Sequence, residues 1–278
     1  MPTYPAPTPV AVAVDLLVGT LHVVAGDRDD VVVTVLPLDP AKQRDVRAAE
    51  EVRVDRVGDT VTVTGPRWKQ YLPFGTGTPA VTVELPTGSD LSGTAGTLYA
   101  EGRLGTVRMS VNAGNARVGE ADRLDLKASA GSVTVGRTTG ATTVRAGAGS
   151  VRIGEVAGQA TVRAANGTTT VESVTGALQV AGAHADVAVG RVRGTLTAKA
   201  ASGGIRVDRV ESGTVTLTTS YGSIEVGVPE GTAAWLDVAS DHGSVRNELR
   251  PVEGPVVDEA TAEITAGTGY GDVLVRRP

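Results

Sequence analysis

Residues 141–158 read ATTVRAGAGSVRIGEVAG, and residues 159–176 read QATVRAANGTTTVESVTG. The second stretch repeats the first in length and in its order of small, apolar and polar residues. Within the first stretch Val144 and Ala146 point to one side of an extended chain, and Arg145 points to the other. Alternation with a period of two predicts strands that have one buried face and one solvent face.

The same unit recurs on both sides of this pair. Its other copies span 107–123, 124–140, 177–194, 195–212 and 213–231, and looser copies follow at 233–249 and 262–275. A glycine such as Gly149 or Gly167 stands near the middle of most copies, as a sharp corner with positive φ requires. A repeat this short predicts one coil, and stacked coils pair as parallel strands.

The fold predicted is therefore all-β: a single-stranded parallel β-solenoid, or β-helix, with about 17–19 residues per coil. The preference of parallel crossovers for one hand favours right-handed winding, and we expect a triangular section. Residues 80–278 form the regular solenoid. Residues 1–79 form an irregular N-terminal β part, continuous with it, that includes an aromatic loop at 66–79 and a helical or looped excursion within 37–57.

The composition limits the core and the chemistry. Hydrophobic residues make up 41% of the 278 residues but aromatic residues only 3%, so Val and Ala must fill a narrow core. The absence of cysteine excludes disulfides, thiolate nucleophiles, iron–sulfur clusters and Cys-based zinc sites. A net charge of -5 with mixed signs offers no footprint for nucleic acid.

No apolar run reaches the ~18 residues of a membrane span, and the N-terminus lacks the pattern of a signal peptide. We therefore expect a cytoplasmic protein, with association to the cell envelope through a partner as the alternative. The proline-rich TYPAPTP (3–9) and the final VLVRRP (273–278) are expected to blunt the strand edges at the two ends.

Catalytic chemistry is not indicated. The histidines lie in different coils, the carboxylates form no pair suited to glycoside hydrolysis, and the glycine-rich corners lack the helix and Lys of a phosphate cradle. The sequence predicts no enzyme, with no catalytic, cofactor or metal residues. Tyr221 and His242 share a corner position in their copies and are expected to be stacked neighbours.

One loop gathers three of the eight aromatic side chains. RWKQYLPFG (67–75) places Trp68, Tyr71 and Phe74 beside Arg67 and Lys69. Large rings do not fit a Val/Ala core, so this loop either closes the outer wall or an end of the solenoid, or serves as an aromatic anchor for a partner.

A second candidate is a column of basic residues on the outer face. Lys127, Arg145, Arg163 and Lys199 occupy the same place in their copies, with Ala181 interrupting. Stacked like charges can contact an anionic surface or polymer. The alternative is a solvated face that discourages lateral sheet association.

The chain resembles the bacterial family of adhesin-like, β-strand-repeat domains of unknown function, also called toastrack domains. Their Gly-Ser-Gly-Asp-Val-like strand motif appears here as AGSVTV, AGSVRI, YGSIEV, HGSVRNEL and YGDVLV. Their near-terminal signature is matched by PEGTAAWLDVASDHGSVRN (229–247). The resemblance implies the β-solenoid fold over nearly the whole chain and offers no catalytic residues.

Three functions remain open. The first is a non-enzymatic scaffold or adhesin-like interaction module that presents a rigid surface to an unknown protein partner or an anionic surface. The second is a structural protein that assembles end to end, as bactofilin-like solenoids do. The third is a polysaccharide-binding or polysaccharide-processing β-helix.

Overall fold

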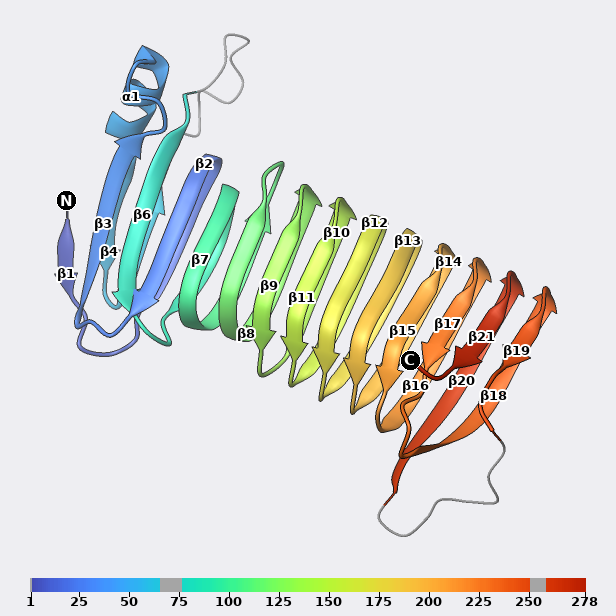
Figure 1. Ribbon diagram of the computed structural model, residues 1–278. Helices are drawn as coiled ribbons and strands as arrows, with labels where there is room; N and C mark the ends of the chain where they lie inside the picture. Colours follow the sequence, from blue (N-terminus) through green and yellow to red (C-terminus); the bar gives the residue numbers. More distant parts are fainter. Residues whose placement is uncertain (1, 66–76, 251–258) are drawn as a thin grey trace. The chain divides into compact units, whose positions relative to one another are not determined.

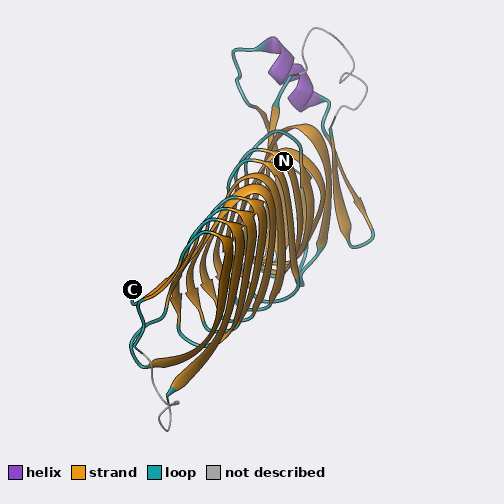
Figure 2. Ribbon diagram, turned by 90° about the vertical axis from the view of Figure 1, so that its right-hand side faces the viewer, coloured by secondary structure: helices purple, strands orange, loops and turns teal. Residues whose placement is uncertain are grey.

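The computed structural model describes residues 2–65, 77–250 and 259–278 (Figure 1). Almost all of the described chain is β-strand, with one helix in those ranges (Figure 2). Successive coils pair in parallel, so the predicted all-β, parallel β-solenoid is confirmed. The hand of the winding and the triangular section stay predictions.

Residue contacts divide the chain into two compact units, residues 1–138 (unit 1) and residues 139–278 (unit 2). The predicted boundary at residue 79, between an irregular and a regular part, stays a prediction. Each unit has its own buried rows of side chains and its own edge strands.

In unit 1 the parallel winding gives way to antiparallel strands. Its strands are β1 (Thr3–Pro5), β2 (Ala11–Gly26), β3 (Asp30–Pro37), β4 (Arg53–Val57), β5 (Thr60–Thr64), β6 (Pro79–Pro86), β7 (Asp90–Val111), β8 (Ala116–Ala130) and β9 (Val133–Thr138). β2 pairs in parallel with β7, and β7 with β8. Antiparallel strands are then added, β3 on β6, β1 on β3, and β4 on β5.

The helix of unit 1, α1 (Gln43–Glu50), forms within the polar stretch that was expected to leave the solenoid. Its Asp45 is only 4% exposed, and the carboxylate accepts a hydrogen bond of 2.9 Å from the backbone N–H of Thr78. This contact fastens the helix to the residues that lead into β6.

The edge strands β1 and β4 of unit 1 are tied to each other. Arg56 donates from one guanidinium nitrogen to the carbonyl of Pro5, at 2.7 Å, and from another to the carbonyl of Gly58, at 3.0 Å. Tyr4 donates its hydroxyl to the carbonyl of Val54, at 3.4 Å. The proline-rich N-terminus thus supplies a short edge strand, since β1 is only three residues long and ends at Pro5. That it blunts this end stays a prediction.

Unit 2 contains the regular coils. Its strands are β10 (Thr142–Ala148), β11 (Val151–Val156), β12 (Gln159–Val174), β13 (Ala177–Val192), β14 (Thr195–Ser202), β15 (Ile205–Val210), β16 (Gly213–Tyr221), β17 (Ile224–Gly227), β18 (Thr232–His242), β19 (Val245–Asn247), β20 (Ala260–Tyr270) and β21 (Val273–Arg276). The expected repeat is visible in the register, because equivalent residues of successive coils are Cα partners.

One buried row shows how the core of unit 2 is built. It consists of Val144, Val162, Val180, Ala198 and Leu217, each at most 1% exposed. Each residue in the row sits above its equivalent in the next coil, so small aliphatic side chains fill the interior and large rings have no place there.

The corners use glycine for a steric reason. Gly167 has a φ of +122°, and a Cβ built on it would lie 2.1 Å from the carbonyl oxygen of Gly149 in the preceding coil. An L side chain at this position would face both an unfavourable backbone angle and a clash with backbone. The sequence prediction that glycines mark the corners is confirmed at Gly167.

The last coils do not follow chain order. β20 pairs in parallel with β16 on one side and with β18 on the other, and β21 lies in the same way between β17 and β19 (Figure 1). In sequence order the outermost coil, β18 and β19, therefore precedes the coil that lies beneath it, β20 and β21. Sequence order had placed the copy at 262–275 last.

This order overturns the expectation for the C-terminal segment. VLVRRP begins with β21, which is paired on both edges and cannot blunt the end of the sheet. The outermost strands of unit 2 are β18 and β19 instead.

Candidate functional site

Three of the four predicted basic residues share one outer column of unit 2. Arg145 is the Cα partner of Arg163, which is followed by Ala181 and then by Lys199. All three cations are exposed. Lys127 belongs to unit 1, where it is exposed on β8 beside Ser110 of β7. The predicted interruption at Ala181 is confirmed, and binding of an anionic partner by the column stays a prediction.

The aromatic loop cannot be assessed in the same way. Arg67, Trp68, Lys69, Tyr71 and Phe74 all lie outside the described residues. Their role as a cap or as an anchor stays a prediction.

The described residues contain another aromatic surface, which the sequence did not single out. Tyr221 is 60% exposed, Trp235 is 63% exposed and Tyr270 is 51% exposed. They lie on β16, β18 and β20, three neighbouring strands of one sheet. Tyr4 and Tyr99, the other described Tyr, Trp or Phe residues, are half-buried. We call Tyr221, Trp235 and Tyr270 the aromatic face.

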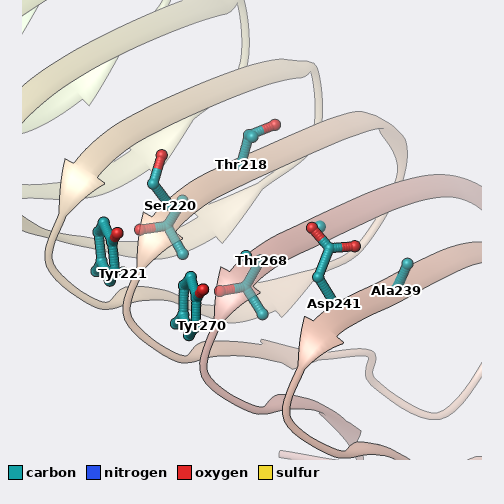
Figure 3. A pocket seen from close by; sticks show the side chains of 10 residues that line it. Thr218, Ser220, Tyr221, Ala239, Asp241, Thr268 and Tyr270 are labelled. Carbon is teal, nitrogen blue, oxygen red and sulfur yellow. The ribbon is translucent and has the colours of Figure 1, made fainter.

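Two members of this face are stacked with a histidine. The rings of Tyr221 and Tyr270, seen side by side in Figure 3, are parallel within 7°, with centroids 5.1 Å apart. The His242 ring is stacked on Tyr270, with centroids 4.4 Å apart. The expected direct contact between Tyr221 and His242 is therefore wrong, because the insertion of β20 places Tyr270 between them. Offset stacking of this kind orders the rings before any ligand binds.

A hollow of about 410 Å³ lies beside the stacked rings (Figure 3). Its middle lies over Gly267 of β20, where an added Cβ would meet no atom within 4 Å. Thr218 of β16 and Ala239 of β18 are the Cα partners of Gly267, and Asp241 lines the hollow two residues further along β18. The hollow exists because the central strand has no side chain at a position where both of its neighbours do, and it presents a hydroxyl, a carboxylate and ring edges together.

Trp235 borders a second hollow, of about 660 Å³. In register with Trp235 lie Glu263 and then Thr214, so the indole stands at the end of a polar row. Arg193, on the same hollow, makes an ion pair of 2.5 Å with Glu211. The exposed indole is therefore available to a partner, and Arg193 on the same hollow is already paired with Glu211.

The turn between β18 and β19, next to the stacked rings of Tyr270 and His242, is held by the carboxylate of Asp272. Asp272 accepts hydrogen bonds of 2.8 Å from both the backbone N–H and the hydroxyl of Ser244. These two bonds, first from the backbone and then from the side chain, hold the pKa of Asp272 below its ordinary value of 3.8. They join the turn between β18 and β19 to the coil beneath it.

Among the described residues, no group of three or more His, Cys, Asp or Glu is placed to hold a metal ion. In those same ranges no helix has the length and apolar character needed to cross a membrane. His22, one of the histidines considered for a metal, stacks on Tyr99 at 4.9 Å in unit 1.

One signal for the aromatic face was present in the sequence. In TAAWLDVAS, Leu236 and Val238 occupy the inward positions of the alternation, which puts Trp235 outside. The position of Tyr270 beside Tyr221 could not be read in the same way, because it depends on the exchanged order of β18 and β20.

Similar solved structures come from bacteria. A "putative adhesin" from Parabacteroides merdae ATCC 43184 is 14% identical, with a TM-score of 0.42, over 100% of this chain and 95% of that one. A "putative adhesin" from Bacteroides fragilis NCTC 9343 is 12% identical, with a TM-score of 0.34, over 99% of this chain and 95% of that one.

None of the curated proteins matches the sequence significantly. The family model described as Toastrack DUF4097 matches residues 18–276, which is nearly the whole chain. The predicted resemblance is thus confirmed, and the chain belongs to the Toastrack DUF4097 family.

Proposed function

We propose that this chain is a non-enzymatic, adhesin-like β-solenoid module that holds a partner against the outer face of β16, β20 and β18. One observation carries the proposal: every exposed Tyr or Trp of the described residues lies on these three strands. Tyr221 and Tyr270 lie together at one end of these strands, and Trp235 lies towards the other end, in register with Glu263 and Thr214. Exposed aromatic residues are typical of binding sites, because they bury large area at a small cost in side-chain entropy.

The rigidity of the surface supports binding. β20 is paired on both edges, and its Tyr270 is stacked between Tyr221 and His242. Because these rings are already ordered, a ligand would not have to immobilise them, and more of the contact energy remains as affinity.

A polysaccharide ligand is the second candidate, and the hollow over Gly267 favours it. Hydroxyls of Thr218 and Ser220, with the carboxylate of Asp241, can exchange hydrogen bonds with sugar hydroxyls while ring edges contact the apolar side of a sugar. Asp241 is the one carboxylate lining this hollow, so the hollow offers binding groups and lacks the pair of carboxylates that glycoside hydrolysis uses.

The basic column remains a proposed second contact. Arg145, Arg163 and Lys199 would add attraction for an anionic partner, and this contribution would weaken as salt rises. The cytoplasmic or envelope-associated location also stays a prediction.

The test is binding of the labelled full chain to arrays of glycans and of cell-surface proteins. A variant with Tyr221→Ser, Trp235→Ala and Tyr270→Ser should lose at least tenfold in affinity for whichever probe the wild type binds. Gly267→Gln should also weaken binding, because it places a side chain in the hollow at a position where an added Cβ meets no atom within 4 Å. The matched control is His22→Ser with Tyr99→Ser, which removes the stacked pair of unit 1.

Equal loss of binding in the control and in the aromatic-face variant would overturn the proposal. Release of shortened or unsaturated sugars from a bound polysaccharide would overturn its non-enzymatic part. A wild-type chain that binds no probe on either array also counts against it.

A further inference from the structure

The outermost strand of unit 2 leaves one edge unpaired within the described residues. β18 is 11 residues long, and β19 adds three more on the second arm of the same coil. Their inner edges pair with β20 and β21. The outer edges present backbone N–H and C=O groups to solvent, and such a row is a template for another strand.

The core of the solenoid is also uncovered at this coil. Val245 is 44% exposed, whereas Val273, its partner in the coil beneath, is fully buried. Leu236 and Val238 are half-buried, although they continue rows whose inner members are closed off from solvent. Apolar side chains of the core are therefore partly exposed beside the unpaired edge.

This edge lacks the devices that usually protect edge strands. The inward positions of β18 carry no charge, and the strand contains no proline or lysine. Its charges, Asp237 and Asp241, are on the outer face, beside Trp235 and Ala239. The inward side of the strand therefore does not oppose the addition of a neighbour, and the two carboxylates on the outer face restrict only its register.

We propose that a second copy of this chain covers this end, through antiparallel pairing of β18 with β18 of the other copy about a two-fold axis. A two-fold contact needs only one kind of surface, which meets itself. Head-to-tail stacking would need a second open edge. The edge strands β1 and β4 of unit 1 are short and bridged to each other, and β4 is charged.

The charges select the register of the pair. A two-fold axis at Asp237 would set that carboxylate against itself, and an axis at Ala239 would set Asp237 against Asp241. An axis at Leu236 or at Val238 keeps the carboxylates apart and sets that apolar inward residue against its own copy. An axis between two residues would set inward side chains against outward ones and is excluded by the pleat.

Dimerisation goes beyond the proposed binding function and does not depend on it. It has a consequence for that function, because Trp235 lies on the strand that forms the seam. Two aromatic faces would then adjoin across β18, and a polymeric partner could engage both copies with a gain in avidity.

The first test is the mass of the full chain by sedimentation equilibrium over a hundredfold range of concentration. We expect a monomer that converts to a dimer and to nothing larger. Val238→Lys, which points a charge inward at the seam, should raise the dissociation constant at least tenfold. The control Thr216→Lys lies on β16, two strands away from the edge, and should leave the dissociation constant within twofold of the wild type.

The second test stands even if Val238→Lys fails to fold. The chain has no cysteine, so a single introduced thiol can form a disulfide only between copies. Residues on the axis of an antiparallel pair have Cα atoms about 4.5–5.5 Å apart, which suits a disulfide. Leu236→Cys or Val238→Cys should therefore yield a covalent dimer on oxidation. Ser240→Cys, on the same side of the strand but off both axes, should not.

Three results would overturn the proposal. They are a wild-type mass that stays monomeric at every concentration, growth into filaments, and disulfide formation at Ser240→Cys equal to that at the axis positions. Loss of the dimer with ligand binding unchanged would leave the proposed function standing, so the two ideas fail separately.

Discussion

The edge strands of unit 1 and of unit 2 differ in how far they protect their unpaired backbone groups. In unit 1 the edges are β1, with three residues, and β4, with five, and Arg56 and Tyr4 tie them together. In unit 2 the edge is the 11-residue β18, which has uncharged inward positions and half-buried apolar side chains. A parallel solenoid does not end by itself, so an end left uncovered marks a surface that a partner can use.

The largest expected effect is a difference in stability between mutations in the covered interior and at the open end of unit 2. Leu196 and Leu236 belong to one inward row, but Leu196 is fully buried and Leu236 is half-buried on β18. Leu196→Ala should lower the free energy of unfolding by about 2–5 kcal/mol, since it leaves a cavity among packed neighbours. Leu236→Ala should cost about 1 kcal/mol or less in the monomer. Chemical denaturation at low protein concentration measures both, and equal losses would show that β18 is already covered.

The next largest loss of stability is expected at the edge of unit 1, where Arg56 joins β4 to β1. Arg56→Ala removes the donor that joins β4 to β1 and should cost about 1–2 kcal/mol, because the carbonyls of Pro5 and Gly58 lose their partner. Hydrogen exchange of β1 and β4 should accelerate while that of β12 does not. Arg53→Ala, on the same strand, is the control. Unchanged exchange in β1 would mean that Arg56 does not close the edge.

A smaller effect on stability is expected from a buried hydroxyl group in the core. The hydroxyl of Thr169 is fully buried and finds no hydrogen-bond partner among the residues that the structure describes. The Cα partners of Thr169 include Val151 and Val187. Thr169→Val keeps the shape of the side chain and removes the unsatisfied hydroxyl, so the free energy of unfolding should rise by about 1 kcal/mol. Thr170→Val, the neighbour that points outward, should change stability little. A loss of stability at Thr169→Val would indicate a hidden polar partner.

The smallest effect is a pH dependence at the open end. The pKa of Asp272 is lower in the folded chain than its ordinary value of 3.8, so its ionised form stabilises the fold. That contribution is complete above the ordinary value and is lost as the pH falls through the lower, folded value. The protection of amides near Ser244, measured relative to their intrinsic exchange rates, should therefore fall on acidification below about pH 4, and Asp272→Asn should reduce this pH dependence. Identical acid profiles for the two proteins would contradict the role of this contact.

Sequence periodicity was enough to predict the coils, their length and their parallel stacking. The reason is local: alternation fixes which side chains are buried, and glycine spacing fixes the corners, as at Gly167. The family followed from the same repeats. The basic column of Arg145, Arg163 and Lys199 was also predictable, because equivalent positions in successive coils become neighbours.

The tertiary structure alone decided the candidate site. Repeats with the same pattern can stack in more than one order, since any of them offers matching edges and matching inward residues. The contacts of Tyr270 with Tyr221 and His242, the hollow over Gly267 and the unpaired edge of β18 all follow from placing β20 inside β18. The sequence by itself determined that this chain is a stack of coils, and only the three-dimensional order of those coils determined which one is left open.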